Sequence, residues 1–330
     1  MRYVKQLLSL FCIAFLVLAV YLPAFSADDK YPSKVITIIV PFSAGGPSDT
    51  IARLVAQTLS VSLKNQIIVE NVAGAGGTIG AARVAKAQPD GYTLFVHHIG
   101  HSTAPSLYRK LTYDPINDFA PIGLINDGAM TLVARKDFPA NNLKELIAYA
   151  KANKSKVNLA NAGVGSASHL AGMLFMSALQ TDLTTIPYKG TGPAMNDLLG
   201  GQVDFMIDQT TNTTSHIKAG KIKVYGVTTK KRLASLPDVP TMSEAGMTNF
   251  EITVWHALYA PKGTPKPVID QLSKALQAAL KDPTLNQRFG ELGSESVAQN
   301  RATPDALRAH LKSEIDKWEP IIKKAGVFAD

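Results

Sequence analysis

The chain has 330 residues, of which 46% are hydrophobic, and its formal net charge is +8 at pH 7. This composition excludes disordered and fibrous proteins, and the length predicts two domains of ordinary size. The single cysteine, Cys12, stands near the start, so the rest of the chain offers no disulfide, thiolate metal site or cysteine nucleophile. The positive charges are spread along the chain without a dense basic cluster, which favours small anions over nucleic acid as ligands.

The first residues have the pattern of an export signal. Arg2 and Lys5 precede an apolar run over residues 7–22, which is followed by small residues at a cleavage site. We therefore expect a signal peptide over residues 1–26 and a periplasmic location, and the loss of those two cations lowers the net charge from +8 to +6. The apolar run is shorter than the roughly 20 residues of a spanning helix, and the bulky residue before Cys12 argues against lipidation.

Strand-like and helix-like segments alternate along the chain in two series. β-branched runs ended by proline and glycine indicate strands, and apolar residues at helical spacing indicate helices. This alternation predicts an α/β fold with a mostly parallel sheet flanked by helices in each series. The expected strands are 35–40, 67–70, 92–97, 130–134, 157–160, 184–187, 203–207, 224–228 and 252–260, and the expected helices are 50–63, 78–87, 143–152, 168–179, 193–200, 214–219, 266–281 and 304–325.

The order of these segments predicts two lobes joined by two crossings. The chain first leaves lobe 1 near residues 122–130, and the strand 252–260 brings it back. We expect lobe 1 to comprise residues 27–125 and 254–330, and lobe 2 to comprise residues 126–253. Two crossings favour a hinge between the lobes.

Two glycine-rich segments have the form expected of an anion site. Residues 41–49 and 163–169 each place a strand end, a glycine turn and a helix start close together. Open α/β sheets bind ligands at such points, where glycine lets the backbone approach and the amides of the first helical turn favour an anion. Two such segments facing each other would hold a carboxylate without an arginine. The alternative is ordinary helix capping, by Ser48 or Asp49 in the first segment and by a serine in the second.

Other strand ends add candidates to the same rim. His98 follows the third expected strand, and Asp208 follows the strand 203–207, where it either faces the cleft or caps the next helix. His97 and His101 are expected to be loop or core residues, although His101 could also lie at the mouth of the cleft. The predicted ligand-binding residues are Phe42, Ser43, Ala44, Gly46, Ser48, Asp49, His98, Gly165, Ser166, Ala167, Ser168 and Asp208.

Three other chemistries are weaker interpretations of these residues. The segment 163–168 lacks the third glycine of a dinucleotide fingerprint, and the histidines lack the His-Glu-x-x-His pattern of a zinc site. A serine hydrolase using Ser166 or Ser168 with a nearby histidine is kept as the alternative function, although the Gly-x-Ser-x-Gly elbow is missing. We therefore expect no cofactor, no metal and no catalysis.

Eight ordered stretches resemble the Bug or TctC receptors, the periplasmic substrate-binding components of tripartite tricarboxylate transporters. The resemblance extends over nearly the whole chain. The stretches are 40–53 with its Gly-Gly-x-x-Asp, 74–80, 89–93, 187–190, 197–201, 216–221, 237–241 and 260–265.

The resemblance implies a two-lobed periplasmic binding fold, type II-like, that closes on its ligand. Elements 42–49 and 163–168 would pinch one carboxylate, partly through ordered water, while the loops 97–101 and 208–212 would face the distal end of the ligand. The implied protein is a monomeric, non-enzymatic receptor that delivers a mono-, di- or tricarboxylate, aromatic acids included, to a membrane permease. A receptor that reports to a membrane sensor is the remaining alternative.

Overall fold

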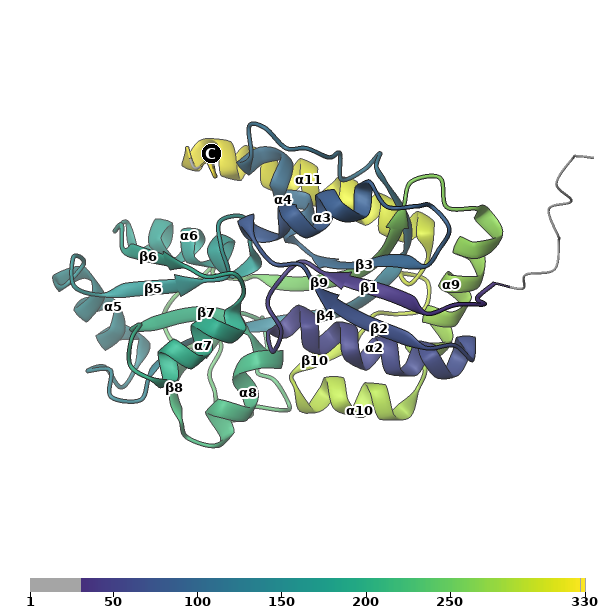
Figure 1. Ribbon diagram of the computed structural model, residues 1–330. Helices are drawn as coiled ribbons and strands as arrows, with labels where there is room; N and C mark the ends of the chain where they lie inside the picture. The colour runs from purple at the N-terminus through teal and green to yellow at the C-terminus, as the bar shows by residue number, and fades with distance from the viewer. Residues whose placement is uncertain (1–30, 327, 330) are drawn as a thin grey trace, which may run out of the picture. The chain divides into compact units, whose positions relative to one another are not determined.

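Buried parallel strands form the centre of the first half of the molecule (Figure 1). The computed structural model describes residues 31–326, 328 and 329, so the expected signal peptide lies outside the described residues. The chain from Lys34 onward forms one compact unit, to which everything below refers. Strand β1 (Ile36–Val40) lies between β2 (Ile67–Asn71) and β3 (Thr93–His98), parallel to both. Its β-branched residues are almost all buried, as expected of a strand covered on both faces.

Helices cover both faces of this sheet, as Figure 1 shows. On one side lie α3 and α4 with the long α11, and on the other lie α2 and α10. The helices are α2 (Pro47–Leu63), α3 (Thr78–Ala85) preceded by the 3-10 turn η1 (Ala75–Gly77), α4 (Gly100–Leu107), α9 (Lys266–Ala279), α10 (Pro283–Glu291) and α11 (Pro304–Ala325).

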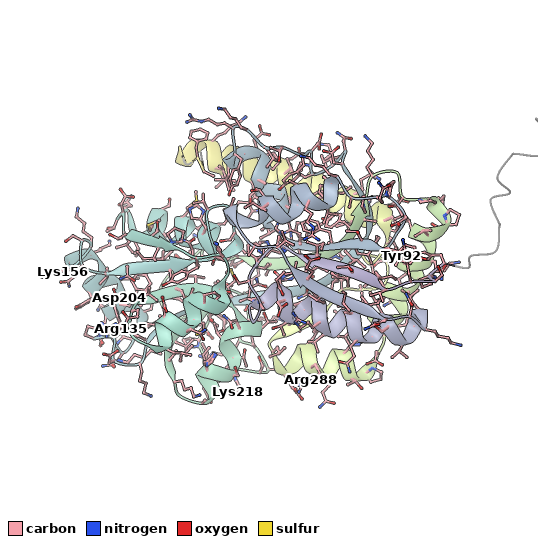
Figure 2. The ribbon with its side chains drawn as sticks, viewed as in Figure 1. Tyr92, Arg135, Lys156, Asp204, Lys218 and Arg288 are labelled. Carbon is pink, nitrogen blue, oxygen red and sulfur yellow. The ribbon has the colours of Figure 1, made fainter. Side chains whose placement is uncertain are left out.

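The second half repeats the arrangement around a smaller group of strands. Strand β5 (Asn158–Asn161) lies parallel to β6 (Thr184–Pro187) and β7 (Phe205–Gln209). Asp204 fixes this group, because its carboxylate accepts hydrogen bonds from Arg135 Nε at 3.0 Å and from the Asn158 amide at 2.9 Å (Figure 2). The remaining elements are α5 (Leu143–Ala152), α6 (Ala167–Leu179), α7 (Thr191–Leu199), α8 (Thr210–Lys218) and β8 (Ile222–Val227).

One long strand takes part in both groups. Strand β4 (Phe119–Arg135) pairs antiparallel with β9 (Thr253–Pro261) up to Ala129, and with β7 and β8 from Met130 or Thr131 onward. The short β10 (Ser294–Ser296) also pairs with β4. The change of partner within β4 falls in the expected first crossing, whereas the exact lobe boundaries stay a prediction.

Most expected elements are present within a few residues, but several local predictions are wrong. Strand β4 begins at Phe119 rather than 130, and the sequence does not predict β10. Helix α8 begins at Thr210 rather than 214, because a run of threonines does not show helical spacing of apolar residues. The loop expected at 208–212 is therefore partly helix. Helix α4 replaces the loop expected after His98. The sequence does not predict this helix because it contains Pro105, and proline usually interrupts a helix. Helix α10 lies where no helix is expected, although Asp282 and Pro283 form an ordinary helix start.

No helix in the described part of the chain combines the length and the apolar character that crossing a membrane requires.

Candidate functional site

A small cavity lies where the ends of several strands meet the starts of several helices. Its free volume is about 20 Å³, which is room for roughly one water molecule. Residues that precede β4 in the chain form one side of the cavity, and residues that follow β4 form the other. A ligand larger than a water molecule fits only if these two sides separate. The lining residues are Phe42, Gly46, Pro47, Ser48, His98, Ala162, Ala167, Ser168, Thr191, Asp208 and Gln209.

Four helices begin at this cavity. Helices α2, α7 and α8 have Gly46, Gly190 and Gln209 as N-caps, and none of these three starts receives a side-chain capping bond. Only α6 is capped by its own sequence, since Ser166 Oγ accepts from the His169 amide. The first-turn amides of a helix lack partners within it and carry partial positive charge, so their convergence favours an anion.

The first wall of the cavity contains a serine bonded to a buried histidine. Ser48 Oγ lies 3.1 Å from His256 Nε2. His256 stands on β9 directly opposite His98 on β3, and both rings are buried. Nothing in the sequence singled out His256, because its position beside Ser48 depends on a strand pairing between residues far apart in the chain.

His98 is the predicted histidine that lines the cavity. Its ring stacks on Phe42 with the ring centres 4.7 Å apart. Burial lowers the pKa of His98 to about 3, so the ring is neutral at physiological pH. Its Nδ1 accepts from the Gly100 amide at 2.9 Å, which assigns the ring hydrogen to Nε2. His98 is thus a neutral hydrogen-bond donor.

The other two histidines of this segment lie behind the wall. His101 is buried among Tyr113, Phe119 and Tyr259, with ring centres 4.8 to 5.9 Å away. His97 accepts from the His98 amide at 2.9 Å and is also buried. Neither lines the cavity, so the structure places both in the core and not His101 at the cleft mouth.

The second wall supplies a hydroxyl and a carboxylate. Ser168 Oγ accepts from the Ala162 amide at 2.8 Å, which leaves its own hydrogen free to turn. Asp208 accepts from the Gln209 amide at 2.8 Å and from Asn212 Nδ2 at 2.6 Å. Burial raises the pKa of Asp208 to about 6, although both hydrogen bonds favour the ionised form. Asp208 lines the cavity, and the N-cap residue of α8 is Gln209 rather than Asp208.

Asp49, although predicted in the site, is turned away from the cavity. Its carboxylate accepts from the Gly45 amide, Arg53 and Asn71 at 2.9 to 3.0 Å. Burial alone would raise the pKa of Asp49, but the bonds from Arg53, Gly45 and Asn71 outweigh it and hold the pKa below its ordinary value. Asp49 thus fixes the turn that presents the start of α2, and neither it nor Ser48 caps that helix.

The remaining predicted residues lie at the edge of the cavity. Ser43 donates to the Lys189 carbonyl through its amide at 2.9 Å and its hydroxyl at 3.1 Å, which joins the two sides. The Ser166 hydroxyl lies 3.2 Å from that of Ser168. Ala44 and Gly165, like Ser43 and Ser166, do not line the cavity. The lining residues that the prediction omitted are Pro47, Ala162, Thr191 and Gln209, all of which stand at strand ends or helix starts that the sequence indicates.

The cavity lining contains no lysine or arginine. In the described part of the chain, no three histidine, cysteine, aspartate or glutamate side chains are grouped to hold a metal ion. Any positive potential at the lining therefore comes from uncharged groups, such as backbone amides, hydroxyl hydrogens and the Nε2–H of His98.

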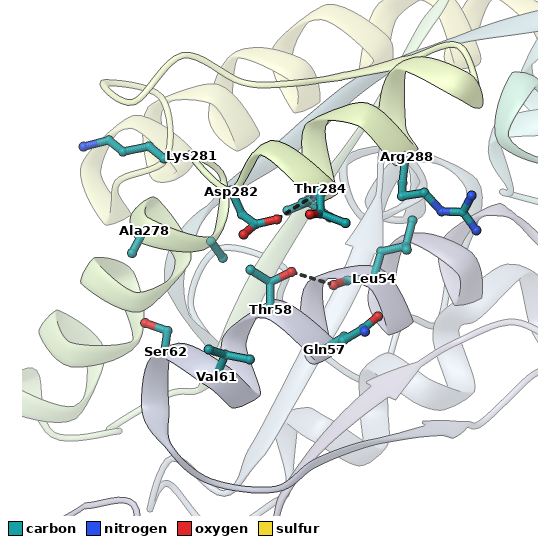
Figure 3. Close-up of a pocket in the computed structure, with 12 residues that line it drawn as sticks. Leu54, Gln57, Thr58, Val61, Ser62, Ala278, Lys281, Asp282, Thr284 and Arg288 are labelled. Carbon is teal, nitrogen blue, oxygen red and sulfur yellow. Dashed lines mark hydrogen bonds between the residues drawn. The ribbon is translucent and has the colours of Figure 1, made fainter.

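A second pocket, which we call the groove, is larger and more open and lies between α2 and the α9–α10 turn (Figure 3). Its volume is about 750 Å³. Two of the polar groups there already serve their own helices, since Thr58 donates to the Leu54 carbonyl and Asp282 accepts from the Leu285 amide. Ligand sites are concave and have a few converging polar groups, a description that fits the small cavity and not this groove.

Comparison with known proteins places the fold among binding proteins. The family model described as "Tripartite tricarboxylate transporter family receptor" matches residues 51–327. The periplasmic binding protein BugD is 54% identical, with a TM-score of 0.88 over 90% of this chain and 99% of BugD.

Two further solved structures hold acids. MatC from Rhodopseudomonas palustris, solved with malate, is 40% identical with a TM-score of 0.86 over 88% of this chain and 100% of MatC. Rpa4515 from the same organism, solved with adipate, is 32% identical with a TM-score of 0.85 over 91% of this chain and 99% of Rpa4515. These likenesses confirm the predicted two-lobed α/β binding-protein fold.

Proposed function

The chain belongs to the tripartite tricarboxylate transporter receptor family, and from that premise we propose that it captures a small carboxylate in the cavity at the four helix starts. The observation that carries the proposal is the convergence of three uncapped helix starts on a cavity lined by no lysine or arginine. Each helix start favours an anion by roughly 0.3 to 1 kcal/mol, and by up to about 2 kcal/mol when partly buried. Malate in MatC and adipate in Rpa4515 support the same ligand class.

We propose that one carboxylate of the ligand lies between the start of α2 and the start of α6. Ser48, Ser168 and the neutral His98 would donate hydrogen bonds to it or to a bridging water, as the Oγ–H of a serine and the Nε2–H of His98 can do. The other end of the ligand would face Asp208.

The proposed cycle needs the two sides of the cavity to move. A free volume of about 20 Å³ does not admit a four-carbon acid, so entry requires separation, and closure then buries the ligand. The hinge would lie where β4 changes partners and where β9 begins. The closed form would deliver the acid to a membrane permease in the periplasm, as the family description supports.

A panel of mono-, di- and tricarboxylates in thermal unfolding tests this proposal. An acid present at about 100 times its Kd stabilises the protein by roughly 2.7 kcal/mol, which raises Tm by several degrees at this size. A panel in which no acid shifts Tm would contradict the proposed function.

The hydrolase alternative gains no support from the serines that it named. The hydroxyls of Ser166 and Ser168 bond to each other and to backbone amides, and His169 Nδ1 accepts from the Gly165 amide. A serine nucleophile needs a histidine base within hydrogen-bonding reach, and among the described residues neither hydroxyl bonds to one. The family and its solved members are binding proteins.

A further inference from the structure

A second set of contacts joins the two sides of the molecule outside the cavity. Tyr108, which ends α4, places its hydroxyl 2.7 Å from the Ala75 carbonyl and 2.9 Å from the Val164 carbonyl. Ala75 precedes β4 in the chain and Val164 follows it, so this one hydroxyl, whose single hydrogen is shared between the two carbonyls, bridges segments from opposite sides of the cavity. None of the three residues lines the cavity.

Gly76 brings the two backbones into direct contact at the same place. Its φ is 59°, and a Cβ at this position would lie 1.7 Å from the Val164 carbonyl oxygen. A Cβ on Gly163 would in turn lie 3.2 Å from the Gly76 amide nitrogen. The obstacle in each case is backbone rather than the end of a flexible side chain. The overlap at Gly76 is too close for a small shift to relieve, so only glycine permits the approach there.

One further bond strengthens the contact. The Thr103 hydroxyl, on α4, lies 3.3 Å from the Gly165 carbonyl, and the ring of Tyr108 packs beside Gly165. We call residues 75–76, Thr103, Tyr108 and 163–165 the latch. Each partner in it is a side-chain hydroxyl or a backbone group of this chain, so the latch can form whether or not a ligand is present.

We infer that the latch holds the two sides closed, and that Tyr108 and Gly76 are positioning residues that set ligand retention without touching the ligand. This inference rests on the proposed function, because it assumes capture between the two sides. A contact that exists only in the closed form increases the closed fraction and therefore the apparent affinity. It also has to break before release, so its loss raises the dissociation rate.

Two substitutions test the latch with malate as the probe. Tyr108→Phe removes one hydroxyl and should weaken affinity about two- to tenfold, through faster dissociation in stopped-flow measurements. Gly76→Ala places a methyl group against the Val164 carbonyl and should weaken affinity more than about tenfold, because backbone rather than a flexible side chain must give way.

Matched controls separate the latch from general damage. Tyr113→Phe removes the hydroxyl of a buried tyrosine for which the described structure shows no hydrogen-bond partner, and it should leave the rates unchanged. Gly201→Ala tests positive φ alone, since Gly201 has a φ of 73° and an added methyl group would meet nothing within 4 Å. Thermal unfolding without ligand verifies that all four variants are folded.

Spin labels measure closure without any ligand. Lys86→Cys and Lys154→Cys, both exposed and on opposite sides, are labelled in a Cys12→Ala background. Tyr108→Phe and Gly76→Ala should shift the distance distribution of the ligand-free protein towards longer values, and the two controls should not. Distance distributions identical to those of the parent protein would overturn the proposed role of the latch. If malate does not bind but the distances shift, malate is not the ligand and the latch stands, while the panel of acids decides the proposed ligand class.

Discussion

The two walls of the cavity are built from similar glycine-rich segments, yet they offer opposite chemistry. The wall that precedes β4 presents the uncapped start of α2, the Ser48 hydroxyl and the neutral His98. The wall that follows β4 presents the start of α6, which Ser166 caps, and it contains Asp208, a carboxylate buried beside the cavity. The first wall can donate hydrogen bonds to an anion, whereas the second both donates through Ser168 and opposes negative charge through Asp208.

This difference shows that similar sequence segments serve different local purposes. In the first segment, Asp49 is paired with Arg53 and Asn71, so its charge is compensated away from the cavity. In the second, Asp208 has only neutral hydrogen-bond donors. We therefore expect the first wall to set the affinity for a carboxylate, and the second to discriminate between acids by the charge at their far end.

The largest effect is expected from filling the second wall. Ser168→Trp places an indole in a cavity of about 20 Å³ and should abolish the Tm shift produced by any carboxylate. Ser177→Trp, on the exposed face of the same helix α6, is the control and should retain the shift. A Ser168→Trp protein that is folded and still stabilised by the acid would place the ligand elsewhere.

A smaller effect, dependent on pH, is expected from Asp208. Because its pKa is raised to about 6 from 3.8, its stabilising contribution is complete below pH 3.8 and is lost as pH rises through about 6. Asp208→Asn keeps the shape, since the Asn212 amide can turn to pair with it. The variant should be more stable than the parent at pH 7.5, by at most about 3 kcal/mol, and the gain should shrink towards pH 4.

Urea unfolding at pH 4, 5, 6 and 7.5 measures this difference. The control is Asp182→Asn, which removes the same charge from an exposed position that does not line the small cavity. A gain in Asp208→Asn that does not vary with pH would contradict the burial of an ionisable carboxyl at this position.

The smallest effect is expected in the groove of Figure 3. Val61 is 77% exposed there and Arg288 pairs with Glu291 on its own helix. Val61→Ser and Arg288→Gln should leave carboxylate binding unchanged within about twofold, since surface substitutions of this kind alter stability by less than about 0.5 kcal/mol. A loss of binding in calorimetry would show that the groove, and not the small cavity, takes the acid.

Much of this architecture could be predicted from local sequence patterns. The β-branched run before Pro41 and the glycine pair after it are sufficient to predict β1, the turn and α2, and the same pattern predicts the turn before α6. His98 and Asp208 could be assigned to the rim because strand ends of parallel sheets share one edge. The predicted site therefore includes seven of the residues that line the cavity.

The rest depends on contacts between residues distant in the chain. Asn71 and Arg53 turn Asp49 away, and His256 reaches Ser48 from β9, 208 residues later. Tyr108 bridges Ala75 and Val164 only because α4 forms despite Pro105. No spacing in a single sequence indicates such pairings, since they are decided by the packing of strands and helices.

Calorimetric titration with matched acids and amides tests the central claim most directly. If the helix starts bind a carboxylate, malate or another acid that raises Tm should bind, whereas its primary amide, of the same shape without the charge, should bind at least about tenfold more weakly. Equal binding of acid and amide, or no heat from any acid, would contradict an anion site built from backbone amides and hydroxyls.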